Sequence, residues 1–165
     1  MPVGAAGFAG LASRFGLMDQ RLSLITLGVE DVARARTFYE ALGWHGHEVE
    51  ETVFFQAGGM AVVLWGRAKL AADAAVEDTG SRGFAGVALA QNVRSPKDVD
   101  AIIAAAERAG ATIDVRPRST FYGGYAGYFR DPDGHLWEIS HNPGFTLEDD
   151  GSLTLPDFGT PGADA

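Results

Sequence analysis

The sequence contains no cysteine, few basic residues and no long apolar run, and each absence excludes a class of function. Without cysteine the chain forms no disulfide, no thiolate metal site and no cysteine nucleophile. A membrane-spanning helix needs about 20 consecutive apolar residues, and the apolar stretches here are much shorter. Lys and Arg number 13 against 22 Asp and Glu, a formal net charge of −9. Proteins that bind nucleic acid present basic surfaces to phosphate. We therefore expect neither a nucleic-acid nor a membrane partner, and we take the cytosol as the default location.

Apolar residues suffice for a core, because they make up 46% of the 165 residues while charged residues make up 21%. We predict a single domain over residues 21–144, after a flexible extension at 1–20 and before an acidic tail at 145–165. The extension is rich in small residues, and its charge, Arg14, follows the apolar part, unlike a secretory signal. In the tail, Asp150-Gly151 forms a predicted turn between two short alternating runs. We expect the tail to lie over a partner subunit.

Strand and helix patterns occur twice in the same order. In each half, a strand precedes a helix that an Asp or Ser caps and a Gly ends, and three strands follow. The first half, residues 21–66, is predicted to contain strands at 22–29, 44–49, 52–56 and 61–65 and a helix from Asp31 to about Leu42. After a polar linker at 67–82, the second half, residues 83–142, is predicted to contain strands at 84–93, 112–115, 122–129 and 135–140 and a helix from Ser95 to Arg108. Both halves therefore read βαβββ.

The last two predicted strands form a hairpin around Glu138. The sequence Asp131-Pro132-Asp133-Gly134 is typical of a turn, since Pro presets φ, Asp bonds nearby N–H groups and Gly tolerates positive φ. Glu138 is the one carboxylate in the final strand. Alternation places Leu136, Glu138 and Ser140 on one face, and Trp137 and Ile139 on the other.

The repeat and its motifs resemble the vicinal oxygen chelate superfamily, which includes glyoxalase I, extradiol dioxygenases and bleomycin-resistance proteins. The resemblance covers Leu22 to Pro143. It rests on Gly28-Val29-Glu30-Asp31, Phe38-Tyr39 and Leu42-Gly43 in the first half, and on the run Tyr128 to Ile139 in the second. It implies an α+β fold of two βαβββ modules that form cupped mixed sheets with helices on the outer face. It also implies a homodimer with paired cups, although cups built within one chain occur in the family.

The resemblance further implies four positions for metal ligands. Carried over one at a time, they fall on Leu24, Val63, Ala88 and Glu138, and only Glu138 can bind a metal. Zn²⁺ and similar ions need three or four converging donors, so we expect no metal cofactor. The polar residues nearby are Thr26, Gln91 and Asn92; Thr and Asn are weak ligands, and Gln91 faces away from Ala88. His45 and His47 are predicted to lie on an exposed strand edge.

The same residues suggest an aromatic pocket. A hairpin register that places Arg130 opposite His135 puts Gly127 opposite Glu138, with Tyr125 and Phe129 on the same face. The predicted ligand-binding residues are Glu138, Tyr125, Phe129, Phe121, Tyr122, Trp65, Phe54, Thr26 and Asn92. Such a pocket suits a flat, partly cationic molecule. The alternative is that these aromatic residues pack in the core, and that Glu138 pairs with Arg116, Arg118 or Arg130.

Two functions remain open at this point. The first is a metal-free small-molecule binding protein of the bleomycin-resistance type, which sequesters a drug or metabolite in the cup. The second is a lyase, isomerase or epimerase acting on an activated carbonyl compound, with or without a divalent metal. Glu138 would be its catalytic base and Tyr125 its electrophilic partner, because burial raises a carboxyl pKa toward working pH. A scaffold without a ligand is the third alternative.

Overall fold

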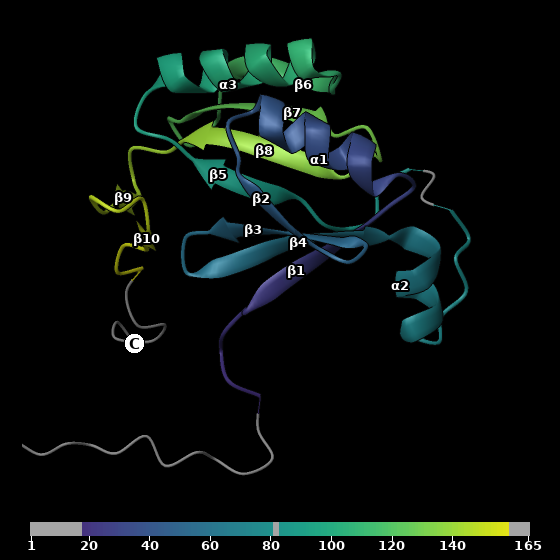
Figure 1. Ribbon diagram of the computed structural model, residues 1–165. Helices are drawn as coiled ribbons and strands as arrows, with labels where there is room; N and C mark the ends of the chain where they lie inside the picture. The colour runs from purple at the N-terminus through teal and green to yellow at the C-terminus, as the bar shows by residue number, and fades with distance from the viewer. Residues whose placement is uncertain (1–17, 81–82, 159–165) are drawn as a thin grey trace, which may run out of the picture.

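The expected α+β class is confirmed in a computed structural model, which describes residues 18–80 and 83–158 (Figure 1). The predicted extension lies mostly outside these residues. The first βαβββ unit contains β1 (Leu24–Val29), α1 (Val32–Ala41), β2 (Gly46–Val49), β3 (Thr52–Ala57) and β4 (Met60–Gly66). The second contains β5 (Leu89–Asn92), α3 (Pro96–Ala109), β6 (Thr112–Ser119), β7 (Tyr125–Arg130) and β8 (Leu136–His141). No helix of the described ranges is long and apolar enough to cross a membrane.

Both units build a four-stranded mixed sheet with equivalent strand orders. The first sheet has the order β1-β4-β3-β2 and the second the order β5-β8-β7-β6. The first strand of each unit pairs with its last strand in parallel, and the other neighbours are antiparallel. Capping fixes where each helix begins: the side chains of Asp31 and Ser95 accept hydrogen bonds from backbone N–H groups in the first turn.

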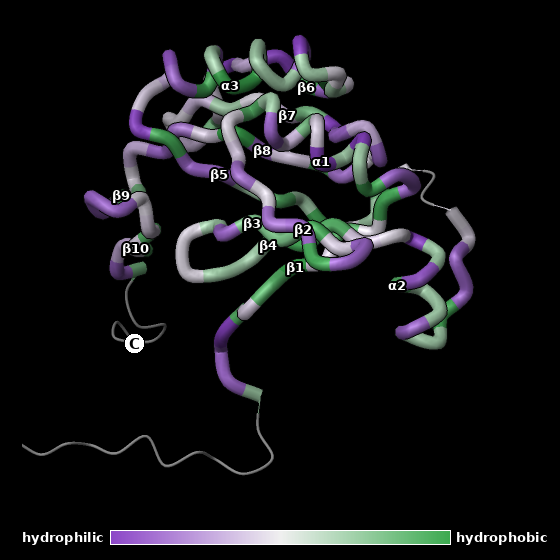
Figure 2. Tube along the Cα trace, viewed as in Figure 1, coloured by the Kyte–Doolittle hydropathy of each residue, from purple (hydrophilic) through white to green (hydrophobic). Residues whose placement is uncertain are grey.

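One face of each sheet packs on α1 and α3 in a shared core. Tyr39 on α1 lies against Phe55 of the first sheet and Trp137 of the second, with ring centroids 5.7 and 6.1 Å apart. Figure 1 shows α1 beside β8, in agreement with these contacts. Figure 2 shows apolar residues along β1 and alternating polar and apolar turns along α3, as expected for a helix with one buried side.

We call the sheet faces that do not pack on α1 and α3 the open faces. Backbone pairing and alternation assign their residues. The first open face carries Leu24, Thr26, Gly28, Phe54, Gln56, Ala61, Val63 and Trp65. The second open face carries Ala90, Asn92, Ala126, Tyr128, Arg130, Leu136, Glu138 and Ser140.

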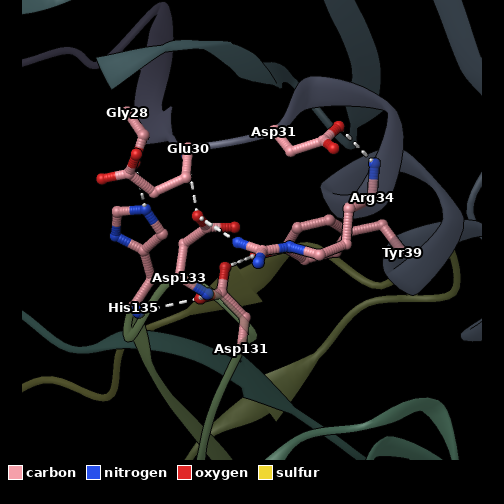
Figure 3. A network of polar contacts seen from close by, with 8 residues as sticks. All are labelled: Gly28, Glu30, Asp31, Arg34, Tyr39, Asp131, Asp133 and His135. Carbon is pink, nitrogen blue, oxygen red and sulfur yellow. Dashed lines mark hydrogen bonds and ion pairs between the residues drawn. The ribbon is translucent and has the colours of Figure 1, made fainter. Parts of the chain in front are cut away.

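The β7–β8 turn joins the two units, and we call these contacts the joint (Figure 3). Asp133 Oδ1 accepts from the backbone N–H of Glu30 and from the Arg34 guanidinium, both at 2.8 Å. The His135 ring donates from Nε2 to the Gly28 carbonyl at 2.9 Å. His135 therefore bonds the other unit.

Asp131 connects the turn to the core within this joint. Its Oδ1 accepts from the backbone N–H groups of Asp133 and His135, and its Oδ2 accepts from the Tyr39 hydroxyl at 2.7 Å. The Tyr39 oxygen in turn accepts from Trp137 Nε1 at 3.1 Å. Burial and the nearby Asp131 carboxylate raise the pKa of Tyr39 well above its usual value, so the hydroxyl stays protonated.

One segment differs from the sequence-based expectation, and the tail agrees with it. The predicted linker contains a helix, α2 (Arg67–Asp73), which packs on β1 and β4. Leu70 and Arg67 lie so close to Gly28 that a Cβ there would meet them at 3.3 Å. The predicted turn in the tail is confirmed: Gly151 lies in the turn between β9 (Thr146–Leu147) and β10 (Leu153–Thr154).

Candidate functional site

Glu138 lies in the middle of the second open face. Its backbone pairs with Tyr128 on β7 and with Ala90 on β5. Residues paired across a sheet point to the same face, so the carboxylate lies between a phenol and a methyl group. Glu138 and Tyr128 are both half-buried. The acid is thus accessible at the surface of a mainly apolar strand.

Tyr128 is held in its neutral form beside this acid. Burial of the phenol and the charge of Glu138, together with hydrogen bonding to it, raise the pKa of Tyr128. Tyr122 from the β6–β7 loop adds a further upward contribution to the pKa of Tyr128. A protonated phenol next to a carboxylate provides one hydrogen-bond donor and one acceptor at the same place.

The predicted hairpin register is wrong by one residue. Arg130 pairs with Leu136, and Glu138 therefore pairs with Tyr128 and not with Gly127. The cause is the turn, because Asp131 pairs with His135 and Gly134 adopts a positive φ of 90° as the third loop residue. A shift of one residue moves every side chain to the other face.

Tyr125 and Phe129 consequently lie on the core face, away from Glu138. The Tyr125 hydroxyl donates to Asp100 on α3 at 3.0 Å, and Phe129 is 2% exposed within the core. The proposed electrophilic role of Tyr125 beside Glu138 is therefore wrong. Tyr128 occupies that place. The turn sequence could have indicated this, because a loop of three residues at 132–134 places Tyr128 opposite Glu138.

The structure distributes the other predicted ligand residues over three places. Asn92 shares the second open face with Glu138. Phe121 and Tyr122 form an edge-to-face ring pair in the β6–β7 loop, where Phe121 is fully exposed. Thr26, Phe54 and Trp65 lie on the first open face, where Thr26 and Phe54 both pair with Val63. Within this chain, the predicted ligand residues therefore do not gather in one pocket.

Two of the three arginines considered as partners for Glu138 bind other acids. Arg116 makes a two-point contact with Glu107, at 2.7 and 2.5 Å. Arg130 donates to Asp114 at 2.7 Å. The alternative prediction, that Glu138 forms an ion pair with Arg116 or Arg130, is therefore wrong.

The donor set does not fit a divalent metal. Thr26 pairs with Val63, and Ala90 pairs with Glu138, so the neighbour of Glu138 on β5 is Ala90 and not Ala88. Zn²⁺, Ni²⁺ and Fe²⁺ require several imidazole or carboxylate donors. Within residues 18–80 and 83–158, no three His, Cys, Asp or Glu side chains gather in a way that could hold an ion.

Known proteins share this architecture. Residues 21–139 match the model of the glyoxalase/bleomycin resistance protein/dioxygenase superfamily. A crystal structure of a glyoxalase-related enzyme from Fulvimarina pelagi is similar at 35% identity with a TM-score of 0.77, over 82% of this chain and 98% of that one. No functionally curated protein matches the sequence.

More distant structures show the fold alone. Fosfomycin resistance protein FosX from Mesorhizobium loti is 21% identical with a TM-score of 0.58, over 76% of this chain and 94% of that one. Lactoylglutathione lyase from Agrobacterium tumefaciens is 18% identical with a TM-score of 0.53, over 75% of this chain and 95% of that one. One of these proteins is thus named for antibiotic resistance and the other for lyase activity.

Proposed function

Because the chain belongs to the glyoxalase/bleomycin resistance protein/dioxygenase superfamily, we propose that it binds a small molecule on the open face that carries Glu138, without a resident metal. The observation that carries this proposal is the pair of Glu138 and protonated Tyr128. The carboxylate accepts a hydrogen bond from an ammonium or N–H group of the ligand. The phenol ring provides an aromatic surface on which a flat group can stack.

A second copy of the chain completes this site in our proposal. The first open face is mainly apolar and partly exposed, with Leu24 at 49% and Phe54 at 38%. Contiguous apolar surface of this kind favours association. The helices α1 and α3 lie in the shared core, and α2 covers the first open face only at its Gly28 end, so the part around Leu24 and Phe54 is available to another molecule. The first open face of one copy would cover Glu138 of its partner and exclude water from the ligand.

The second candidate is a lyase, isomerase or epimerase, and the contact between Tyr128 and Glu138 favours it. Glu138 would remove a proton from the carbon next to a carbonyl group, and the C–H electron pair would move into an enolate. The Tyr128 hydroxyl would donate a hydrogen bond to the enolate oxygen. The raised pKa of Tyr128 suits this role, because the phenol keeps its proton.

A ligand screen by thermal shift, followed by matched variants, tests the proposal. We expect amine-bearing aromatic compounds to raise the Tm of the natural chain. In Glu138→Gln their affinity falls at least about tenfold, which corresponds to about 1.4 kcal/mol. Glu77→Gln, which neutralises an exposed acid outside both open faces, leaves affinity unchanged. Equal affinity in Glu138→Gln and the natural chain would contradict the proposal.

Proton exchange then separates binding from catalysis. Carbonyl analogues of the compounds that bind are incubated with the protein in D₂O and followed by NMR. Exchange of the proton next to the carbonyl, lost in Glu138→Gln, supports the enzymatic candidate. Saturable binding without exchange supports sequestration.

A further inference from the structure

A separate cavity lies between the two units, on the opposite side of β8 from Glu138. Its volume is about 150 Å³. Trp137 and Ile139 line it from β8, and alternation turns these side chains away from the face that carries Glu138. The complete lining consists of Tyr39, Leu42, Trp44, Gln91, Ile102, Ala105, Phe129, Trp137 and Ile139. We call this space the inter-unit pocket.

The inter-unit pocket has a buried aromatic floor and an accessible rim. Tyr39 and Phe129 are 1% and 2% exposed. The rim contains half-buried side chains and the exposed Gln91, which lies on β5. A small molecule can therefore enter past Gln91, and the end of the pocket closes on the core.

Polar groups on the floor are already satisfied. The Tyr39 hydroxyl donates to Asp131 and accepts from Trp137 Nε1, at 2.7 and 3.1 Å. The remaining lining side chains are apolar, except for the amide of Gln91 and the indole N–H of Trp44. A water molecule needs about two to four polar partners to be held in a cavity. The floor therefore favours an apolar occupant over water.

Charge distinguishes the inter-unit pocket from a wider hollow elsewhere on the chain. That hollow, between α1 and β2–β4, measures about 680 Å³ and is lined by acids such as Glu30, Glu48 and Glu51 together with Arg36 and Lys69. No charged residue lines the inter-unit pocket. Transfer of a charged group into an apolar site without a partner is costly, so the pocket selects neutral molecules.

We propose that the inter-unit pocket is a second small-molecule site, which takes a neutral aromatic group of about one ring. Apolar cavities of about 150 Å³ take up benzene. Trp44 and Trp137 stand edge to face at 5.8 Å and 89°, an arrangement that offers a further ring both a face and an edge. The site is distinct from the one around Glu138 and does not depend on it.

Occupancy of the pocket would stabilise the contact between the units. Tyr39, Leu42 and Trp44 come from the first unit, and Trp137 and Phe129 from the second. A ligand that binds only the folded chain raises its stability in proportion to the logarithm of ligand concentration. A bound aromatic group would therefore stabilise the packing of α1 against the second sheet.

Fluorobenzene, observed by ¹⁹F NMR with the full chain, tests this site. We expect the natural protein to broaden and shift the fluorobenzene signal, and sodium fluorobenzoate, which is charged, to remain unaffected. Ala105→Leu places a larger side chain in the pocket and abolishes the effect. Ala101→Leu, the same change at an exposed position of α3, preserves it. Glu138→Gln also preserves it, so failure here is distinguishable from failure of the proposed function.

Two results would overturn the inference: an unperturbed signal with the natural chain at millimolar fluorobenzene, or equal perturbation with Ala105→Leu. Circular dichroism and thermal unfolding establish that the variant is folded. If Ala105→Leu does not fold, Ile102→Phe fills the pocket from its half-buried rim, and the same loss of signal is expected. Persistence of binding in that variant would count against the site.

Discussion

The two units repeat one order of strands, but their open faces differ in chemistry. The first open face carries Phe54 and the buried Val63, with polar groups from Thr26 and Gln56. The second presents Glu138 together with the phenol of Tyr128. On the core side, both sheets carry apolar residues, since both pack on helices.

The difference shows which positions of the repeat are constrained. Packing against α1 and α3 requires apolar side chains of suitable volume in both units. On the open faces this constraint applies only at buried positions such as Val63, Ala126 and Ser140, and the exposed positions are free of it. In our proposal one open face has become a polar recognition surface and the other an apolar cover for its partner's site.

The largest expected effect comes from breaking the joint that relates the two units. Asp131→Ala leaves the buried Tyr39 hydroxyl and the N–H groups of Asp133 and His135 without their acceptor. Unsatisfied buried groups cost about 1 to 3 kcal/mol each, so we expect the free energy of unfolding to fall by about 3 kcal/mol or more. Urea unfolding monitored by circular dichroism measures it.

Asp114→Ala is the matched control for this change. Asp114 pairs with Arg130 in a partly exposed contact, and such pairs contribute below about 1 kcal/mol. A similar loss of stability in the two variants would contradict the role assigned to Asp131.

Titration of the tyrosine hydroxyls at alkaline pH sharpens the contrast between the open faces. Only the second open face carries a tyrosine, Tyr128, which lies beside Glu138. The pKa values of Tyr39, Tyr125 and Tyr128 are raised above the ordinary value of 10.0 in the folded chain. The folded state therefore holds these protons more tightly than the unfolded state. Their contribution to stability is complete below pH 10 and is lost as pH rises above it. Unfolding measured at a series of pH values should show this decline.

Glu138→Gln separates Tyr128 from the other tyrosines. Removing the negative charge next to Tyr128 lowers the pKa of this phenol. The near-ultraviolet absorbance of tyrosinate should therefore begin to rise at a lower pH than in the natural chain. Superimposable titration curves would exclude the contact.

The tail belongs to the second unit alone and provides a smaller test. Arg94 donates to the carbonyl groups of Leu147 and Glu148, which attaches the β9–β10 hairpin to its own chain. We expect truncation after Pro143 to leave the fold intact and to weaken the proposed dimer by roughly tenfold, or about 1.4 kcal/mol. Light scattering over a dilution series measures the mass, and an unchanged profile would refute the prediction.

We expect the natural chain to retain no metal ion and a redesigned chain to retain zinc. After incubation with Zn²⁺ and desalting, we expect mass spectrometry to find no retained ion. The triple variant Thr26→His, Val63→Glu and Ala90→His should retain zinc in the proposed dimer, where the two new donors on the first open face of one copy meet the new imidazole at position 90 and Glu138 of its partner. About one equivalent in the natural chain, lost in Glu138→Ala, would show that the donor set has been misread.

The sequence predicted most of the fold because capping and periodicity are local signals. Asp31, Ser95 and Gly110 mark helix ends that the structure confirms, and each predicted strand overlaps an observed one. The strand predicted at 84–93 was too long, since β5 spans only Leu89–Asn92. The helix α2 was missed because Arg67 and Lys69 gave its segment the polar character of a linker. Its alanines, which are strong helix formers, were the available signal.

The site was predicted in part because register depends on one turn. Glu138 and Asn92 lie on one sheet face, and Tyr122 lies close enough to Tyr128 to affect its pKa. Tyr125 and Phe129 were assigned to the wrong face, since the turn was read with a loop of two residues instead of three. The joint was not predictable, because its contacts join residues far apart in sequence whose meeting depends on how the two units pack.

The joint also determines how the chain folds. It connects Glu30 to Asp133 across 103 positions, and Gly28 to His135 across 107. Ribosomal synthesis releases the first unit before the residues that bind it exist, and distant contacts form late because their loops must close first. Until then Tyr39 lacks both hydrogen-bond partners. The two repeats, although alike, should therefore unfold together in one cooperative transition.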